Sequence, residues 1–150
     1  MAIPTLIISM KNTGRMGRVF ADTDVVLDLL AQREPFYDAA ARLFTRADNG
    51  TLTICVSALS FSNLNYLLSR RYDARESRRI LDKFKVLVKV LAVNEKTIEL
   101  ALNSKFTDFE DAIQYYTATQ NNIRTLLTRN IRDYKHAAIK VFTPETYLKL

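Results

Sequence analysis

The chain has 150 residues, 48% of them hydrophobic and 25% charged, and its 22 Lys and Arg outnumber its 16 Asp and Glu to give a net charge of +6. This balance is typical of a single folded domain and excludes a disordered chain. The single cysteine excludes an internal disulfide framework, the single histidine excludes a histidine-rich metal site, and every apolar run falls short of the roughly 18 residues that span a membrane. We expect a cytoplasmic protein without a membrane anchor, and the basic balance favours a polyanionic partner such as nucleic acid.

Short apolar runs alternate along the chain with amphipathic stretches. Residues 18–21 predict a strand, and apolar residues spaced four apart predict a helix over 24–32. A second helix is expected to begin at Pro35 and to end at an Asn-Gly pair. Further strands are predicted over 52–56, 88–93, 124–127 and 139–142. Further helices are predicted over 58–71, 74–86, 95–103 and 108–121 and from Pro144 onward, the first three capped by Ser57, Asp73 and Asn94.

This alternation of strands and helices indicates the fold class. It is typical of βαβ units, which form a mostly parallel sheet. The strands are short and almost wholly apolar, as expected where helices cover both faces of the sheet. We therefore predict a three-layer α/β fold with a central parallel sheet of four to five strands over residues 18–150. Residues 1–17 include a polar stretch with two of the three glycines, and we expect an N-terminal extension there.

Four acids are expected to meet at one edge of this sheet. In an open parallel sheet, ligands bind beyond the carboxyl ends of the strands. Asp22 ends the first strand, and Asn130 and Asp133 follow the fourth. Asp108 and Asp111 share one face in the first turn of a helix. Helix capping or solvation explains each acid alone, but acids crowded at one edge repel one another unless a cation joins them.

A cluster of carboxylates on a basic protein suits one kind of chemistry. Magnesium and manganese prefer oxygen ligands, which are a few carboxylates together with water and substrate phosphate. Such an ion polarises a phosphodiester, lowers the pKa of a bound water and stabilises the leaving oxygen. The surrounding Lys and Arg would hold a polyanionic backbone. The pattern therefore indicates hydrolysis of nucleic acid without a catalytic histidine.

Four segments of the sequence are similar to the motifs of a known family. They are VFADTDVVLD at 19–28, DFEDAIQ at 108–114, TRNIRDY at 128–134 and VFTP at 141–144. In this order they resemble the PIN-domain family, and the similarity covers residues 18–150. It is greatest with the bacterial (VapC-like) subfamily whose members are toxins of toxin–antitoxin pairs.

The resemblance implies a metal-dependent endoribonuclease that uses Mg²⁺ or Mn²⁺ and acts on RNA. Carried over by position, Asp22 is the first acid of the site and Asp111 the third. Asp133, or the position of Asn130, is the fourth, and Asp108 is an additional acid one helical turn before Asp111. The same resemblance assigns substrate contacts to Thr128, Arg129 and Asn130, and it implies a small antitoxin protein as partner and a homodimer.

One position departs from the family pattern. The family usually has Glu in the helix after the second strand, where this chain carries Asn63. An amide oxygen still ligates a metal or a water, but it carries no charge and cannot act as a base. Lower metal affinity is expected. A PIN fold that binds RNA or a protein without cleaving is therefore kept as an alternative function.

A second alternative comes from the start of the domain. Asp22-Thr-Asp24 also matches the opening of haloacid-dehalogenase-like phosphatases, in which Asp22 would be a nucleophile and Asp24 an acid–base group. That class requires a later glycine-rich loop, and all three glycines lie before residue 51. We therefore interpret Asp24 as a helix N-terminal residue. His136, Cys55 and Asp28 are not expected to take part in the chemistry.

Overall fold

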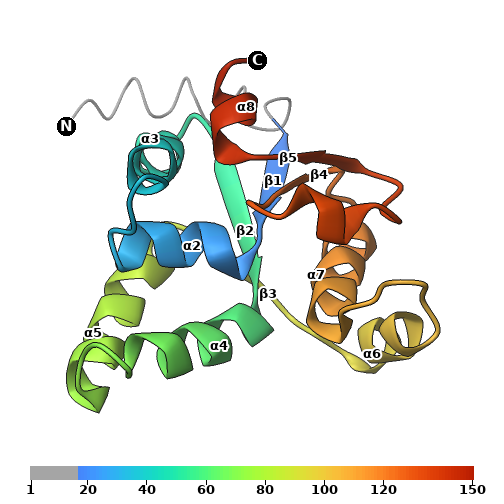
Figure 1. Ribbon diagram of the computed structural model, residues 1–150, viewed down its shortest axis with the longest axis horizontal. Helices are drawn as coiled ribbons and strands as arrows, with labels where there is room; N and C mark the ends of the chain where they lie inside the picture. Colours follow the sequence, from blue (N-terminus) through green and yellow to red (C-terminus); the bar gives the residue numbers. More distant parts are fainter. Residues whose placement is uncertain (1–16) are drawn as a thin grey trace.

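The computed structural model describes residues 17–150, which contain a five-stranded sheet in which each neighbouring pair of strands is parallel (Figure 1). The strand order is β3-β2-β1-β4-β5, so β1 lies at the centre. The strands are β1 (Arg18–Ala21), β2 (Thr53–Ser57), β3 (Lys89–Leu91), β4 (Thr125–Leu127) and β5 (Lys140–Phe142). The predicted α/β fold with a central parallel sheet of four to five strands is confirmed.

Helices lie against both faces of the sheet (Figure 1). They are α2 (Thr23–Leu30), α3 (Tyr37–Asp48), α4 (Ala58–Leu68), α5 (Ala74–Lys85), α6 (Glu95–Leu102), α7 (Phe109–Gln120) and α8 (Pro144–Leu148), with a 3₁₀ helix η1 (Ile131–Tyr134). The first four, with α8, supply apolar side chains to one face of the sheet. Helix α7 covers the other face, and α6 packs against α7.

The two faces of the sheet follow from the alternation of side chains along each strand. Val19 and Ala21 of β1 face the helices α2 to α5, whereas Phe20 between them faces α7. In β2, Ile54 shares the first face and Cys55 the second. All five side chains are buried. The covering helices on both sides explain why the central strands β1 and β2 have consecutive buried apolar side chains.

Polar side chains begin most of the helices, as the sequence indicates. The predicted caps Ser57, Asp73 and Asn94 each accept a hydrogen bond from a backbone N–H in the first turn. Asp22 and Asp108 cap α2 and α7 in the same way. The last two caps fix two carboxylates at helix N-termini on the same edge of the sheet.

The structure differs from the predicted elements mainly at their ends. The strand predicted over 88–93 is confined to Lys89–Leu91, since only these residues pair with β2 and no other strand of residues 17–150 pairs with its outer side. The helix predicted over 24–32 ends at Leu30, and Gln32 turns the chain with a φ of 52°. The 3₁₀ helix η1 was not predicted, and it brings Asp133 back toward the sheet edge.

Two further expectations concern the ends of the chain and membranes. The extension predicted over 1–17 lies, except for Gly17, outside the residues that the structure describes. Among residues 17–150, each helix is too short or too polar to cross a membrane.

Candidate active site

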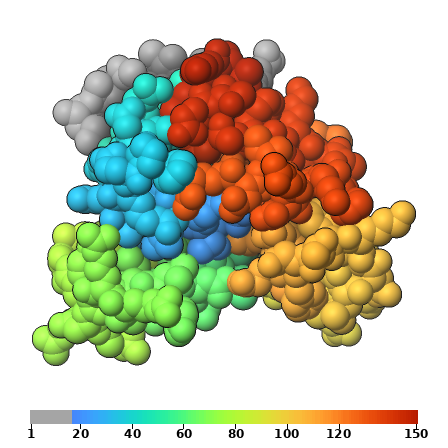
Figure 2. All heavy atoms as spheres, in the orientation of Figure 1, coloured from blue at the N-terminus to red at the C-terminus, as the bar shows by residue number. Residues whose placement is uncertain are grey.

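A pocket of about 560 Å³ opens where β1 passes into α2, at the carboxyl end of the central strand. Its walls also come from α4, α7 and the segment after β4. Figure 2 shows the surface indented between the green α4 region and the gold and orange α6–α7 region. The acids that line the pocket are Asp22, Asp24, Asp108, Glu110, Asp111 and Asp133. Asn63 and Asn130, also singled out from the sequence, line it as well.

Asp22 lies at the base of the pocket and is held by four donors. Its Oδ1 accepts from the Thr23 backbone N–H at 2.7 Å and from Gln114 Nε2 at 3.5 Å. Its Oδ2 accepts from Thr128 Oγ1 at 3.0 Å and from Tyr134 Oη at 2.9 Å. None of these donors carries a positive charge. Burial raises the pKa of Asp22, and the hydrogen bonds only partly offset that rise.

Asp111 is joined to Asp22 through one hydroxyl group. Tyr134 Oη lies 3.4 Å from Asp111 Oδ1 as well as close to Asp22, so the two carboxylates flank the same oxygen. Burial raises the pKa of Asp111 to about 7, and the negative charges of Asp22, Asp108 and Asp133 contribute to the rise. Burial, followed by the charges of Asp22, Asp111 and Asp24, holds the pKa of Tyr134 far above its ordinary value, so this hydroxyl stays protonated. The four predicted acids therefore influence one another electrostatically.

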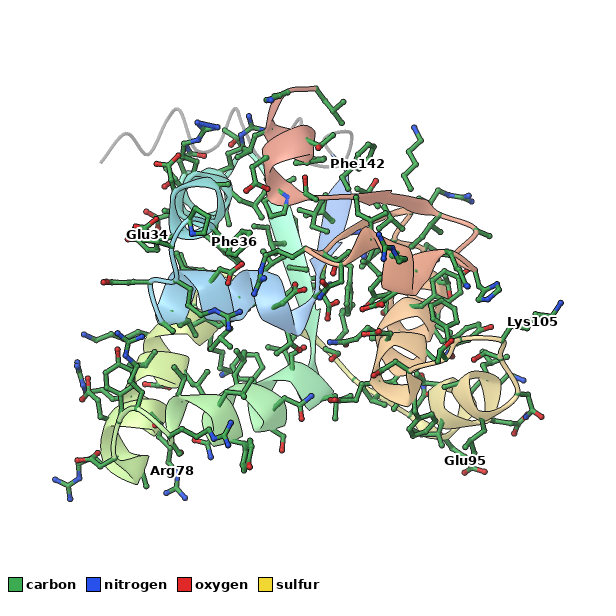
Figure 3. All side chains as sticks on the ribbon, viewed as in Figure 1. Glu34, Phe36, Arg78, Glu95, Lys105 and Phe142 are labelled. Atoms are coloured by element: carbon green, nitrogen blue, oxygen red, sulfur yellow. The ribbon has the colours of Figure 1, made fainter. Side chains whose placement is uncertain are left out.

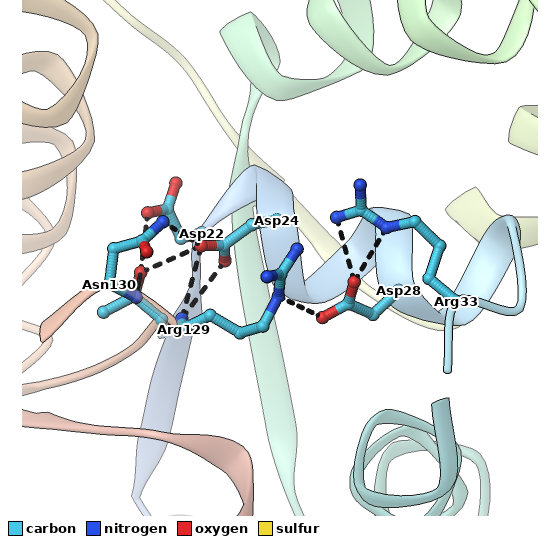
Figure 4. Close-up of polar contacts among 7 residues, drawn as sticks. Asp22, Asp24, Asp28, Arg33, Arg129 and Asn130 are labelled. Atoms are coloured by element: carbon cyan, nitrogen blue, oxygen red, sulfur yellow. Dashed lines mark hydrogen bonds and ion pairs between the residues drawn. The ribbon is translucent and has the colours of Figure 1, made fainter. Parts of the chain in front are cut away.

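Asp24 has a larger part in the site than its sequence position indicates. It stands in the first turn of α2, as predicted, but its carboxylate also organises the segment after β4 (Figure 4). It accepts hydrogen bonds from Thr128 Oγ1 at 3.3 Å, the Arg129 backbone N–H at 3.3 Å and Asn130 Nδ2 at 3.1 Å. Burial and the charge of Asp22 raise the pKa of Asp24 to about 7. Sequence reasoning missed this role because the contacts span more than 100 positions.

A buried polar network supports the pocket from below. Gln114 Nε2 donates to Ser60 Oγ at 2.8 Å and to Thr23 Oγ1 at 3.1 Å, and Gln114 Oε1 accepts from Ser57 Oγ at 2.6 Å. The network ties α7 to β2, α4 and α2. One signal in the sequence pointed to Gln114, since it lies three residues after Asp111 and therefore on the same face of α7.

The mouth of the pocket brings together two residues from facing helices. Asn63 on α4 donates through Nδ2 to Glu110 Oε1 on α7. Asn63 is half-buried and Glu110 is exposed. Asp108 and Asp133 are exposed at the same mouth. Glu110 was not singled out from the sequence, although it puts a carboxylate directly beside the neutral Asn63.

The three residues expected to lie outside the chemistry are found elsewhere. Cys55 is buried within β2, where burial raises the pKa of its thiol. His136 is exposed and contacts the ring of Phe106 edge-on, with 6.3 Å between the ring centroids. Asp28 is buried in α2 and forms ion pairs with two arginines. Asp28 is therefore paired with arginines, as the sequence led us to expect.

The model of the PIN domain matches residues 18–132, which is more than half of the chain. The chain belongs to the PIN domain family. A search of curated proteins gives no match.

Solved structures show that the fold is shared widely. The complex of VapBC2 from Rickettsia felis with a DNA fragment from its promoter contains a chain with a TM-score of 0.63 and 18% identity, covering 83% of this chain and 96% of that one. A toxin–antitoxin complex from Klebsiella pneumoniae contains a chain with a TM-score of 0.63 and 19% identity, and the match covers 85% of this chain and 98% of that one. VapC20 of Mycobacterium tuberculosis, a sarcin–ricin loop cleaving toxin, has a TM-score of 0.58 and 19% identity. The match covers 72% of this chain and 86% of that one. At these identities the similarity is one of fold.

The chemistry of this PIN pocket fits a hard divalent cation, although its ligands are not assembled around one point. The donors are carboxylate and amide oxygens, which Mg²⁺ and Mn²⁺ prefer. A cation would also relieve the mutual repulsion that raises the pKa of Asp111. Among residues 17–150, however, no three Asp, Glu, His or Cys side chains are grouped closely enough to hold one ion together. Side-chain rotation or bridging water would therefore accompany binding.

Proposed function

We propose that this PIN domain is a divalent-metal-dependent endoribonuclease and the toxin of a toxin–antitoxin pair. The observation that carries the proposal is the pair of carboxylates of Asp22 and Asp111 on either side of Tyr134 Oη, at 2.9 and 3.4 Å, in a pocket with further acids at its mouth. Membership of the PIN family supports the same chemistry.

The metal would be Mg²⁺ or Mn²⁺. Asp22 and Asp111 would hold it, with Asp108 and Asp133 nearby and Asn63 as a neutral oxygen ligand. When bound, it supplies polarisation of a phosphodiester and a water of lowered pKa. The rest of the chemistry is the work of this chain's own residues.

Those residues hold the carboxylates and the substrate segment in position. The hydroxyls of Thr128 and Tyr134 orient the Asp22 carboxylate, and Tyr134 keeps its proton throughout because its pKa is raised so far. Asp24 fixes the backbone at Arg129, and Asn130 lines the pocket where RNA would contact it. Thr128 is buried against Asp22 and would act on the substrate through that carboxylate.

The partner assignments follow from the relatives of similar fold. Two of them are toxin–antitoxin or VapBC complexes, and one of these is bound to promoter DNA. We infer that this chain also associates with a small antitoxin and forms a homodimer. Expression of the chain should arrest growth, and the protein from an adjacent small reading frame should restore it. Arrest that persists in Asp111→Asn would contradict a toxin that acts by cleavage.

A non-cleaving binding module is the second candidate, and one observation favours it. The side chain at position 63 carries no charge and is engaged with Glu110. Lower ligand charge weakens the binding of hard cations. A module of this kind would keep the fold and the net charge of +6 while losing the metal.

A metal titration with a cleavage assay separates the two candidates. The purified chain is incubated with single-stranded RNA across a range of Mg²⁺ and Mn²⁺ concentrations, and thermal unfolding is followed in parallel. We expect metal-stimulated cleavage and a rise in Tm with metal, with Mn²⁺ more effective than Mg²⁺ because it binds such ligands more tightly. Asp111→Asn should abolish both. Absence of both effects in the unaltered chain at every Mn²⁺ concentration would favour the binding module.

A further inference from the structure

A buried aspartate beside the acid pocket holds two arginines (Figure 4). The side chain of Asp28 is 2% exposed. Its Oδ1 accepts from Arg33 Nε at 2.9 Å and lies 2.9 Å from Arg33 Nη2. Its Oδ2 accepts from Arg129 Nε at 2.7 Å. One carboxylate therefore fixes two guanidinium groups, one on each of its oxygens.

The arginines come from different parts of the chain and are held on more than one side. Arg33 follows α2, whereas Arg129 lies in the segment after β4. The Arg129 guanidinium also stacks on Phe36, with 4.1 Å between its central carbon and the ring centroid. Figure 3 shows Phe36 between α2 and α3. These contacts limit the rotamers of Arg129, so little conformational entropy remains to be lost on binding a ligand.

Both arginines retain hydrogen-bonding capacity. Among the described residues 17–150, Arg129 uses only Nε of its guanidinium group in hydrogen bonds, and Arg33 Nη1 likewise has no partner there. Their side chains are 24% and 37% exposed. The remaining N–H groups are the donors that bind a phosphate oxygen in a bidentate geometry.

Asp28, Arg33 and Arg129 carry more positive charge than is needed to neutralise the buried Asp28 carboxylate. One arginine neutralises one carboxylate, so these three side chains together carry one net positive charge, beside the Asp24 carboxylate that interacts with Arg129. Arg33 lines the same pocket as Asp22 and Asp111. A polyanion that approaches several carboxylates is repelled, and fixed positive charge at the edge of the pocket offsets that repulsion.

We propose that Arg33 and Arg129, oriented by Asp28, form a two-guanidinium clamp for a backbone phosphate of the RNA strand, next to the phosphate that is cleaved. Asp28 is a positioning residue in this arrangement. The clamp rests on the proposed function in that RNA is the ligand of the pocket. It needs no metal, because guanidinium groups bind phosphate directly.

A purely structural role is the competing explanation. The same ion pairs would then only connect α2 to the segment after β4, and their loss would lower stability without a specific effect on RNA. Binding measured without metal distinguishes the two explanations, since it reports on phosphate contacts independently of cleavage.

The experiment measures fluorescence anisotropy of a labelled single-stranded oligouridylate in EDTA over a range of salt concentrations. Arg33→Gln and Arg129→Gln should each weaken binding about five- to tenfold and reduce the slope of log K against log salt by about 0.7. Arg33→Lys retains the positive charge but not the planar guanidinium group. Its affinity for the oligouridylate should lie between those of the unaltered chain and Arg33→Gln. The matched control is Arg78→Gln, because Arg78 on α5 is exposed and points away from the pocket (Figure 3). It should weaken binding less than twofold.

Asp28→Asn gives a test whose sign differs between explanations. The change adds one unit of positive charge, so a diffuse electrostatic effect would tighten RNA binding. Loss of the orienting carboxylate should instead weaken it about fivefold or more, as removing either arginine does. Circular dichroism checks that each variant is folded, and the partly exposed Arg33 provides a decisive variant if Asp28→Asn fails to fold.

The outcomes separate the clamp from the nuclease. Arginine variants that bind RNA as Arg78→Gln does would overturn the clamp and leave the nuclease standing. Clear losses of RNA affinity in the arginine variants would support the clamp. If the unaltered chain also shows no metal-stimulated cleavage, the nuclease would be rejected while the clamp stands. An unaltered chain that does not bind oligouridylate would overturn the clamp and the assignment of RNA as its ligand.

Discussion

Asp22 and Asp28 are both buried and stand within the same short stretch of chain, yet their surroundings are opposite in kind. Asp22 is 8% exposed and is held by neutral donors, which include the hydroxyls of Thr128 and Tyr134. Asp28 is 1% exposed and is paired with Arg33 and Arg129. The charge of Asp28 is therefore matched within the protein, whereas Asp22 has no ion-pair partner among residues 17–150.

The comparison separates a carboxylate with charged partners inside the protein from one that has only neutral partners. Burial without a positive partner raises the pKa of Asp22, and this is a cost that a structural role would not require. Perturbed carboxylates of this kind are typical of functional sites. Two buried aspartates on one helix and its cap thus have different purposes, and substitutions at the two positions should have different consequences.

The largest expected effects come from replacing each aspartate by asparagine. Asp22→Asn should reduce metal-stimulated cleavage about a hundredfold or more, because it removes a charged ligand. Its effect on the metal-free free energy of unfolding should stay within about 1 kcal/mol, since the neighbouring hydroxyls can reorient toward an amide. Asp28→Asn should lower that free energy by about 2–4 kcal/mol, because two partly buried arginines lose their counter-charge.

Urea unfolding in EDTA, with cleavage assays in Mn²⁺, measures both quantities. The comparison fails if Asp22→Asn destabilises the metal-free protein as much as Asp28→Asn does. Double replacement should give additive changes in unfolding free energy, because Asp22 and Asp28 share no direct partner.

The second-largest effect that we expect is a dependence of protein stability on pH. Asp24 and Asp111 have a pKa of about 7 in the folded protein against an ordinary value of 3.8. Between these values the folded state binds protons that the unfolded state has released, so these two groups make stability fall as pH rises from about 4 to about 7. A bound cation favours the ionised carboxylates and should remove the fall.

The measurement is Tm between pH 5 and pH 8, first in EDTA and then in Mn²⁺. Asp24→Asn should make the profile in EDTA less steep, since one of the groups with a raised pKa is absent. An unchanged profile in Asp24→Asn would show that other groups cause the pH dependence.

The fold and the positions of several acids follow from local features of the sequence. Asp22 ends an apolar run and Asp108 begins a helix, and each of these placements needs only neighbouring residues. The contacts that turn these acids into one site are not local. Tyr134 meets Asp22 across 112 positions, and Glu110 meets Asn63 across 47.

The missed residues share this property. Asp24 was interpreted only as a helix N-terminal residue, and its hydrogen bonds to the segment after β4 depend on the pairing of β1 with β4. That pairing cannot be derived from periodicity, which predicts strands but not their neighbours. The 3₁₀ helix that carries Asp133 and Tyr134 is too short to produce a periodic pattern.

A smaller effect is expected at Asn63. Asn63→Glu should place a second carboxylate beside Glu110, so the metal-free protein should lose several degrees of Tm through like-charge repulsion. The added charge should raise Mn²⁺ affinity about five- to tenfold and increase cleavage. Isothermal titration and thermal unfolding measure these changes.

Glu110→Gln in the same chain is the matched control for that prediction. In the double variant Asn63→Glu/Glu110→Gln, the loss of Tm should disappear because one charge of the pair is removed. If Asn63→Glu lowers Tm equally in both backgrounds, repulsion from Glu110 is not the cause.

The smallest effect is expected at His136, the only histidine of the chain. The side chain is exposed, lies outside the residues that line the acid pocket, and contacts the protein through the edge of Phe106. In the proposed reaction a bound cation would supply the water, so no imidazole would be needed. His136→Ala should therefore leave cleavage unchanged within twofold and stability within about 0.5 kcal/mol, as is usual for a surface substitution. Cleavage rates between pH 5.5 and pH 8 should coincide for the variant and the unaltered chain. A large loss of cleavage rate confined to the acidic end of this range would instead assign the histidine a role in proton transfer.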